Sequence, residues 1–478
     1  MIALSLTEVA RATGGRVVTP DGVDPDGVVV DGPVVTDSRE AGPGSLYVAR
    51  VGEHADGHDF VAGARERGAV AALVSRPVGD LPVVVVDDTE VAFGLLAREV
   101  VTRVPGLEVV GITGSSGKTS TKDLLGAVLA TVGPTVAPIG SYNSEIGVPL
   151  TVCRVTADTR FLVVEMGARG IGHVAHLARV APPRVGVVLN VGTAHVGEFG
   201  SREAIARAKS ELVAALPAGG LAVLNADDAA VRAMASVTAA RVVLVGEADD
   251  ADLRATDVSL DAGGRPTFTV ESATGSRSLT LGLVGRHHVG NALAVLAVAL
   301  ELGMPFEQAC AALESARAAS RWRMEVTERA DGVTVVNDAY NANPDSMRAA
   351  LTALERMGQG RRTWAVLGTM LELGEESSAL HAEVGADVAA HAVDELLVVG
   401  DAASPLADGA RAATASATGG GTASGRTTRT RLVHDADAAE TLLREELRSG
   451  DVVLFKSSRD AGLRLLGDRL AGPREELT

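Results

Sequence analysis

The chain has 478 residues, which is too many for one hydrophobic core and predicts two to four domains. Hydrophobic residues make up 46% and charged residues 22%, which is a globular composition. The formal net charge of −17 disfavours a general binder of nucleic acids or membrane surfaces, although a local pocket could still bind small anionic substrates.

The two cysteines, Cys153 and Cys310, stand in apolar surroundings, so we expect two small core residues and no disulfide framework. The first residues, MIALSLTEVARATGG, lack a basic region followed by an apolar run, so we expect no signal peptide. The apolar stretch NALAVLAVALELG is shorter than the ~20 residues that cross a bilayer. We therefore expect a soluble, cytoplasmic protein with no membrane insertion and no nucleic-acid partner. No self-association motif is evident, so we expect a monomer.

Short apolar runs alternate with Ala-rich helical patterns along the chain. The runs are AVAALVS, LPVVVVDD, LEVVGITG, RFLVVEMG, RVGVVLNVG, GLAVLNADD, RVVLVGE, GVTVVNDAY, TWAVLGTM, ELLVVGD and DVVLFKSS. Runs of this kind are typical of strands buried on both faces, as in parallel sheets covered by helices. We predict an α/β fold with functional residues at the carboxyl ends of the strands.

Two breaks divide the chain into three predicted domains, residues 1–106, 107–318 and 319–478. The first is a Pro-Gly break before a new strand in TRVPGLEV, and the second lies in ESARAASRWRMEV, where a helical pattern gives way to a strand. Residues 412–430, AATASATGGGTASGRTTRT, are low in complexity, so we predict a flexible surface loop there.

The segment VVGITGSSGKTSTKDLLGAVLA predicts a phosphate loop between a strand over 109–112 and a helix from about Lys118. In this arrangement backbone N–H groups point at phosphate oxygens, and the helix N-terminus adds partial positive charge. Lys118 would reach the β- and γ-phosphates, and the Thr119 hydroxyl would bind Mg²⁺. Ile112 stands where the general pattern has glycine. Lys122, one turn further on, is predicted to face solvent.

Three further residues predict a metal site beside this loop. Glu165 ends the apolar run FLVVE, and His195 follows the next strand, whose end should face the same crevice. Lys209 lies on the helix SREAIARAKSELV and is one of only four lysines among 44 Lys+Arg. A lysine beside a cation is electrostatically unfavourable unless its amine has reacted with CO₂ to give a carbamate, which binds Mg²⁺ as a carboxylate does. Arginine is too basic to replace it readily.

These motifs resemble a known family. TGSSGKTS, EMGA, NVGTAHVGEFGS with AKSEL, GRHHVGNALAV and NDAYNANPDSMRAAL are similar to the Mur ligases of peptidoglycan synthesis, and the resemblance covers nearly the whole chain. TGSSGKTS and DAYNANPDSM favour the branch that joins D-alanyl-D-alanine to UDP-MurNAc-tripeptide over the branch that adds diaminopimelate or lysine. The third residue of the tripeptide stays open.

The resemblance implies a UDP-binding first domain, a central ATP-binding domain and a Rossmann-like third domain that closes over ATP and binds the dipeptide. It also implies ATP, two Mg²⁺ ions, a CO₂-derived carbamate on Lys209, and activation of the substrate carboxylate as an acyl phosphate. The implied catalytic residues are Lys118, Glu165, His195 and Lys209, and the implied metal ligands are Thr119, Glu165, His195 and carbamylated Lys209.

The ATP-binding residues that the resemblance implies are Thr113, Gly114, Ser115, Ser116, Gly117, Lys118, Thr119, Ser120, His288, Asn291, Arg323, Asp338 and Asn341. His288 and Asn291 would face the adenine, Arg323 would reach the phosphates, and Asp338 and Asn341 would hold the ribose side. The implied substrate residues are Ser38, Arg39, Asn143, Lys456, Ser458 and Arg459. The chain departs from the family with Thr369 where aspartate is frequent and with KSSR where KGSR is usual.

Two other interpretations stay open. A sister Mur ligase or a folylpolyglutamate-synthetase-like ligase would keep the chemistry but use another acceptor. A non-catalytic nucleotide-binding switch would need the phosphate loop but not the set of Glu165, His195 and Lys209.

Overall fold

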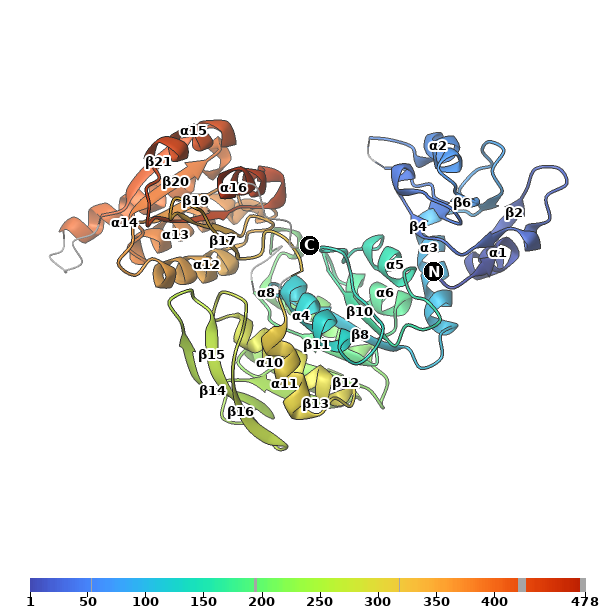
Figure 1. Cartoon of the computed structure of the whole chain (residues 1–478), viewed down its shortest axis with the longest axis horizontal. Coiled ribbons are helices and arrows are strands. Elements are labelled where there is room, and N and C mark those ends of the chain that lie inside the picture. Colours follow the sequence, from blue (N-terminus) through green and yellow to red (C-terminus); the bar gives the residue numbers. More distant parts are fainter. Residues whose placement is uncertain (53, 193–195, 318, 420–426, 473–478) are drawn as a thin grey trace.

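The computed structural model describes residues 1–52, 54–192, 196–317, 319–419 and 427–472. Three lobes follow one another along the chain, with the N-terminal and C-terminal lobes on either side of a central lobe (Figure 1). Each lobe is built on a largely parallel sheet covered by helices, so the predicted α/β class is confirmed. The exact domain boundaries stay predictions.

The N-terminal lobe contains a five-stranded sheet of order β2-β7-β6-β5-β4, in which only β2 is antiparallel to its neighbour, and a small β1-β3 pair. Its helices and strands are β1 (Leu4–Ser5), α1 (Leu6–Thr13), β2 (Arg16–Val18), β3 (Val29–Val30), β4 (Val34–Val35), β5 (Leu46–Val48), α2 (Val61–Glu66), β6 (Ala71–Val74), β7 (Val83–Val85) and α3 (Thr89–Thr102). Helix α1 begins with a capping box between Ser5 and Glu8, which satisfies the first free backbone N–H groups.

The central lobe contains a nine-stranded sheet of order β16-β15-β14-β13-β12-β11-β8-β10-β9, parallel from β9 to β14 and antiparallel beyond. Its elements are β8 (Glu108–Thr113), α4 (Lys118–Ala130), β9 (Thr135–Val136), α5 (Gly147–Val152), β10 (Phe161–Glu165), α6 (His173–Val180), β11 (Val185–Val188), α7 (Val196–Phe199), α8 (Arg202–Ala214), β12 (Leu221–Asn225), α9 (Ala229–Arg232), β13 (Arg241–Gly246), β14 (Leu253–Leu260), β15 (Pro266–Ser272), β16 (Gly275–Thr280), α10 (His288–Glu301) and α11 (Phe306–Ser315).

The C-terminal lobe contains a six-stranded sheet of order β17-β18-β22-β19-β20-β21, in which only β17 runs antiparallel. Its elements are β17 (Glu325–Glu328), β18 (Thr334–Asn337), α12 (Pro344–Met357), β19 (Thr363–Leu367), α13 (Ser377–Ala390), β20 (Glu395–Val399), α14 (Ser404–Gly419), β21 (Arg429–Val433), α15 (Ala436–Glu446), β22 (Val452–Lys456) and α16 (Leu463–Ala471). Helix α12 begins with Pro344 at its first position and a box between Asn343 and Ser346, which is a strong start signal.

The lobes are joined in two different ways. One cluster of buried apolar residues runs from α1 and α3, with Phe93 and Leu96, into α5, α6 and the central sheet, with Val152 and Leu177. The N-terminal and central lobes therefore share a core. The C-terminal lobe has clusters of its own on the two faces of its sheet, and Val284 is the central-lobe residue that joins one of them.

Two sequence predictions are corrected by the structure. Residues 412–419 of the predicted surface loop continue helix α14, and β21 begins at Arg429, while 420–426 lie outside the described residues. The Ala-rich start of that segment has high helix propensity, which outweighs its lack of apolar periodicity. Lys122, predicted to face solvent, is only 2% exposed. Both cysteines are buried as predicted.

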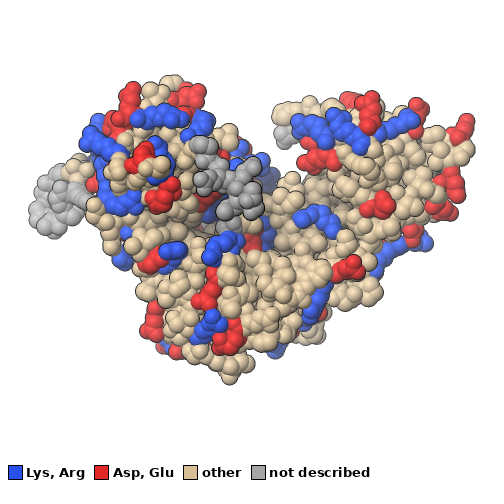
Figure 2. All heavy atoms as spheres, viewed as in Figure 1, with Lys and Arg blue, Asp and Glu red and all other residues tan. Residues whose placement is uncertain are grey.

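Acidic and basic side chains are mixed over the face shown in Figure 2, and a broad notch separates the N-terminal lobe from the C-terminal lobe. Among the described residues, the helices are all too short or too polar to span a bilayer.

Candidate active site

Parallel pairing of β8 with β10 and β11 brings three strand ends together. Glu165 pairs with Ile112, and Val188 pairs with Thr113, so the residues after each strand emerge at one edge of the sheet. This edge is where ligands bind in open α/β sheets. The prediction that the Glu165 strand and the strand before His195 end at the same crevice is therefore confirmed for the strands.

The predicted phosphate loop connects β8 to α4, and α4 begins at Lys118 as expected. Lys118 Nζ donates to the carbonyl of Gly114 at 2.6 Å. The loop is braced by Asn190, whose side-chain oxygen accepts from the backbone N–H groups of Ser115 and Ser116, both at 2.9 Å. Sequence reasoning missed Asn190, although a polar residue two positions after the buried strand β11 was a usable signal.

Gly117 caps the start of α4 with a φ of 80°, in the left-handed region. A Cβ at this position would lie 2.8 Å from Asn291 Oδ1. We expect Gly117→Ala to destabilise the protein by about 1–2 kcal/mol through backbone strain. The displaced loop should also weaken ATP binding. Urea unfolding and titration calorimetry measure the two effects, and unchanged affinity for ATP would contradict the expected displacement.

Glu165 is 1% exposed and has no basic side chain within ion-pair distance in the described part of the chain. Its carboxylate accepts from the Thr119 hydroxyl at 3.0 Å and from the Asn143 amide at 2.7 Å. Thr119 also contacts the Ser141 hydroxyl at 2.7 Å. A buried carboxylate beside a hydroxyl supplies the hard oxygen donors that Mg²⁺ prefers, so these residues fit the predicted metal.

His195, the third predicted ligand, lies outside the described residues, and no group of three His, Cys, Asp or Glu forms a metal cluster within 1–192 and the other described ranges. Lys209 does lie where predicted: it is 5% exposed and lines the same cavity as Lys118 and Glu165. Burial lowers the pKa of the Lys209 ammonium well below its usual 10.5, and the charge of Lys118 lowers it further.

The lowered pKa of Lys209 predicts how the stability of the folded protein depends on pH. The unfolded chain keeps the ordinary lysine pKa and binds the Lys209 proton more tightly than the folded protein does. Stability should therefore rise with pH from the folded pKa toward 10.5. In CO₂-free buffer we expect the melting temperature of Lys209→Met to rise less between pH 7 and 10 than that of the wild type, as measured by scanning calorimetry. Equal slopes would contradict the lowered pKa.

Arg323 reaches this site from the linker that precedes β17. Its Nη2 donates to Thr119 Oγ1 at 3.3 Å and to Ser141 Oγ at 3.1 Å, and its guanidinium lies 4.4 Å from the centre of the Tyr340 ring. Its Nε is buried without a hydrogen-bond partner among the described residues. A buried unpaired donor beside the phosphate loop suits an anionic ligand.

Asp338 and Lys456 meet because β18 and β22 are parallel neighbours with adjacent ends. Lys456 Nζ donates to Asp338 Oδ2 at 2.5 Å and to the carbonyl of Asn341 at 3.2 Å. Burial lowers the pKa of Lys456, while Asp338 opposes that shift. Lys456 thus supports the loop that carries both predicted ribose-side residues.

His288 and Asn291 lie at the start of α10, where Asn291 Nδ2 and His288 Nδ1 are 3.3 Å apart. Burial lowers the pKa of His288 well below 6.5, and His287 lowers it further, so this imidazole is neutral at pH 7. Asn291 and His287 also line a second cavity of about 410 Å³ at the carboxyl ends of β11, β12 and β13.

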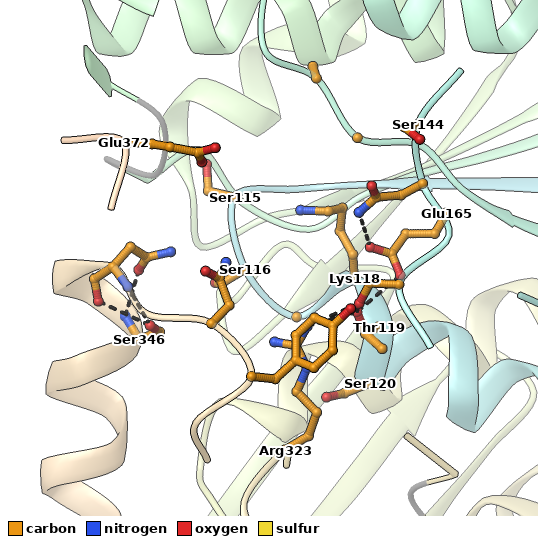
Figure 3. Close-up of a pocket in the computed structure, with 18 of the residues that line it drawn as sticks. Ser115, Ser116, Lys118, Thr119, Ser120, Ser144, Glu165, Arg323, Ser346 and Glu372 are labelled. Atoms are coloured by element: carbon orange, nitrogen blue, oxygen red, sulfur yellow. Dashed lines mark hydrogen bonds between the residues drawn. The ribbon is translucent and has the colours of Figure 1, made fainter. Parts of the chain in front are cut away.

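The site cavity has a volume of about 720 Å³ and is lined by residues from all three lobes. Figure 3 shows Ser115, Ser116, Lys118 and Arg323 around it, with Glu165 beside Thr119. The predicted residues that line it are Ser115, Ser116, Gly117, Lys118, Thr119, Ser120, Asn143, Glu165, Lys209, His288, Arg323, Asp338, Asn341 and Lys456. Thr113 and Gly114 lie directly before this part of the loop.

Four predicted substrate residues do not line the cavity. Ser38 and Arg39 lie in the N-terminal lobe, where Arg39 pairs with Asp37. Ser458 accepts from the backbone N–H of Leu371 at 2.9 Å, and Arg459 is exposed, 5.9 Å above Tyr340. Their roles stay predictions.

The N-terminal lobe instead contributes Arg50 and Glu90, an ion pair of 2.6 Å at the edge of the cavity. Sequence reasoning missed this pair because the two residues are brought together only by the fold.

A phosphate loop that faces a second parallel-sheet domain across a shared cavity places the chain among phosphate-loop nucleotide-binding proteins. Three family models match it: "Mur ligase family, catalytic domain" over residues 33–98, "Mur ligase middle domain" over 112–299, and "Mur ligase, glutamate ligase domain" over 322–459. The chain belongs to the Mur ligase family.

Several relatives with strong similarity to this chain share one name. The UDP-N-acetylmuramoyl-tripeptide–D-alanyl-D-alanine ligase of Mycobacterium tuberculosis (strain ATCC 25618 / H37Rv) is 48% identical over 98% of each chain. The ligase of the same name from Escherichia coli (strain K12) is 38% identical over 84% of this chain and 86% of its own. Among solved structures, MurF from Acinetobacter baumannii has a TM-score of 0.86 at 30% identity, covering 98% of this chain and 99% of its own.

Proposed function

We propose that the protein is an ATP-dependent amide ligase that joins D-alanyl-D-alanine to UDP-MurNAc-tripeptide. The products are UDP-MurNAc-pentapeptide, ADP and phosphate, in the synthesis of peptidoglycan precursors. The observation that carries the proposal is one cavity that is lined by residues of all three lobes, including the phosphate-loop lysine Lys118. Relatives that are 48% identical over 98% of each chain bear the name of this activity.

ATP is proposed to lie with its phosphates on residues 114–119. The start of α4 offers backbone N–H groups there, and Lys118 of the loop and Arg323 of the linker add two charged donors. The adenine is placed near His288 and Asn291, at the junction of the two cavities, and the ribose near Asp338 and Asn341.

A free carboxylate is a poor electrophile, so amide formation needs activation. In the proposed reaction the terminal carboxylate oxygen of the tripeptide attacks the γ-phosphorus, the bond to the ADP oxygen breaks, and an acyl phosphate forms. The dipeptide amine then attacks the acyl carbon and loses a proton, and the carbon–oxygen bond to phosphate breaks. Lys118 and Arg323 would hold charge on the transferring group, and closure of the lobes would exclude water from the acyl phosphate.

Thr119 and Glu165 would hold Mg²⁺, which supplies charge neutralisation on the phosphate oxygens when bound. Lys209 is proposed to carry a carbamate that contributes to a second Mg²⁺ site. Because its pKa is lowered, its amine is neutral more readily than an ordinary lysine, and the neutral amine is the form that bonds to CO₂ with loss of a proton. His195 completes the proposed ligand set.

The N-terminal lobe is proposed to bind the UDP part of the substrate through Ser38 and Arg39. Arg50 and Glu90 of that lobe line the same cavity as the phosphate loop, so the peptide would pass them on its way to Asn143. Lys456, Ser458 and Arg459 are retained as candidates for the dipeptide carboxylate, with Lys456 the one that lines the cavity.

Phosphate release tests the proposal. The purified protein is mixed with ATP, Mg²⁺ and UDP-MurNAc-tripeptide, with and without D-alanyl-D-alanine, and the product is weighed by mass spectrometry. We expect release that depends on the dipeptide and a product heavier by the dipeptide minus water. Release with a single amino acid and an earlier muramyl precursor, but not with the dipeptide, would move the protein to a sister ligase.

A further inference from the structure

A buried ion pair lies one turn behind the phosphate loop, outside the lining of either cavity. Lys122 and Asp123 of α4 are 2% and 6% exposed and pair with each other. Lys122 Nζ also donates to the carbonyl of Pro138 at 2.9 Å and to the Ser320 hydroxyl at 3.2 Å. Three acceptors around one ammonium match its three donors, whereas a planar guanidinium would not fit the same arrangement.

The pair holds the linker between the central and C-terminal lobes. Asp123 accepts from the backbone N–H of Ser320 at 2.8 Å and from its hydroxyl at 3.1 Å. Ser320 lies between α11 and β17, five residues before β17 begins at Glu325. Together with Lys122, three hydrogen bonds therefore fix this one linker residue to the phosphate-loop helix.

Two segments leave this pair and meet again at the phosphate site. From Pro138 the chain runs to Ser141, which lies 2.7 Å from the Thr119 hydroxyl. From Ser320 it runs to Arg323, whose Nη2 donates to both Thr119 and Ser141. The two segments thus enclose the first turn of α4, with the ion pair at one end and the proposed phosphate and metal residues at the other.

Beyond Ser320 the linker contacts the other lobe. The Trp322 indole donates to Asp468 at 3.0 Å, and the Met324 backbone N–H donates to Asp338 at 3.0 Å. Trp322 and Met324 have φ values of 59° and 50°, a strained conformation for non-glycine residues, on either side of Arg323. Such strain persists only where surrounding contacts impose it.

We propose that Lys122, Asp123 and Ser320 are positioning residues that determine where Arg323 enters the phosphate site. They hold the linker at its last central-lobe contact before the strained turn, so that the guanidinium is presented to the transferring phosphoryl group. The proposal rests on the proposed function. An error of about 1 Å in the placement of a reacting or stabilising group can cost roughly 100-fold in rate.

A double-mutant cycle tests the proposal. Asp123→Asn and Ser320→Ala are each made alone and together with Arg323→Ala, and kcat for ligation is measured at saturating substrates. Asp123→Asn alone should lower kcat roughly 10- to 100-fold, and the gentler Ser320→Ala by less. In the Arg323→Ala background both should cost less than about twofold, because residues that act through one group are not additive.

Asp451→Asn is the matched control. Asp451 is 3% exposed and accepts from Arg362 and Trp364 within the C-terminal lobe, so its loss perturbs a buried network remote from the linker. It should lower the melting temperature with little change in kcat per folded molecule in either background. The positioning role is wrong if Asp123→Asn lowers only the melting temperature, as this control should. It is also wrong if the fold-loss in kcat caused by Asp123→Asn is the same with and without Arg323→Ala.

The same set of variants is tested for ATP binding by measuring the Kd for ATP with Mg²⁺ by titration calorimetry. The Kd of the double variant should be lower than the product of the two single fold-changes predicts. This separates the two hypotheses. A wild-type protein that binds ATP but shows no dipeptide-dependent phosphate release contradicts the proposed ligase, whereas an active wild type with independent effects at Asp123 and Arg323 contradicts only the positioning role.

Discussion

Replacing Lys118 with alanine is expected to lower kcat for ligation by at least about 10²- to 10³-fold, the typical cost of one lost donor to a developing charge. Lys118 is the only basic residue of the loop itself, and it follows the sharp turn at Gly117 that starts α4. The ammonium would move with the phosphoryl group as charge develops on it. Phosphate release at saturating ATP measures the effect.

Lys118→Arg is the informative companion. Arginine is far more frequent than lysine in this chain, but its larger planar group would meet a site fitted to an ammonium 2.6 Å from the Gly114 carbonyl. We expect weakened ATP binding with some activity left, and melting temperatures near that of the wild type for both variants. Near-normal turnover in Lys118→Ala would remove the phosphate loop from the mechanism.

Replacing Lys209 with arginine is expected to abolish most of the activity, because arginine keeps a positive charge and forms no stable carbamate. The same burial that lowers the pKa of Lys209 would leave the guanidinium of the variant charged in the cavity wall beside Lys118. Among the described residues, no carboxylate pairs with the side chain at this position. Full activity in Lys209→Arg would contradict the carbamate.

Two further experiments test the proposed carbamate. Wild-type protein equilibrated with ¹³C-labelled bicarbonate should show a carbamate carbon signal that is absent in Lys209→Ala. Added formate should partly restore the activity of Lys209→Ala, because a small carboxylate can occupy the space left by the shortened side chain, but it should not restore Lys118→Ala. Rescue of both variants would show a non-specific effect of the anion.

Much of the fold followed from the sequence because buried parallel strands are continuous apolar runs. RFLVVEMG and DVVLFKSS became β10 and β22 for this reason. The antiparallel strands β14 to β16 were not predicted, because residues such as those in LRATDVSL alternate between buried and exposed positions and carry many polar side chains.

The residues of the candidate site that belong to local sequence motifs could be predicted. The residues that reach the site only through contacts between distant segments could not. The phosphate loop and Glu165 lie at strand ends that parallel pairing brings together. Lys122 looked like an ordinary surface lysine, since nothing near it in the sequence reveals Ser320, its partner 198 positions away. Asn190, Arg50 and Glu90 likewise acquire their places only from packing between elements.

The shared apolar core of the N-terminal and central lobes has a consequence for how the molecule melts. Helix α3 belongs to a cluster that continues through α5 and α6, so those two lobes should lose their structure in one cooperative step. The C-terminal lobe, with separate clusters around its own sheet, can lose its structure on its own. A calorimetric scan should then contain two transitions, and ATP, which is proposed to contact both units, should bring the two transition temperatures closer together.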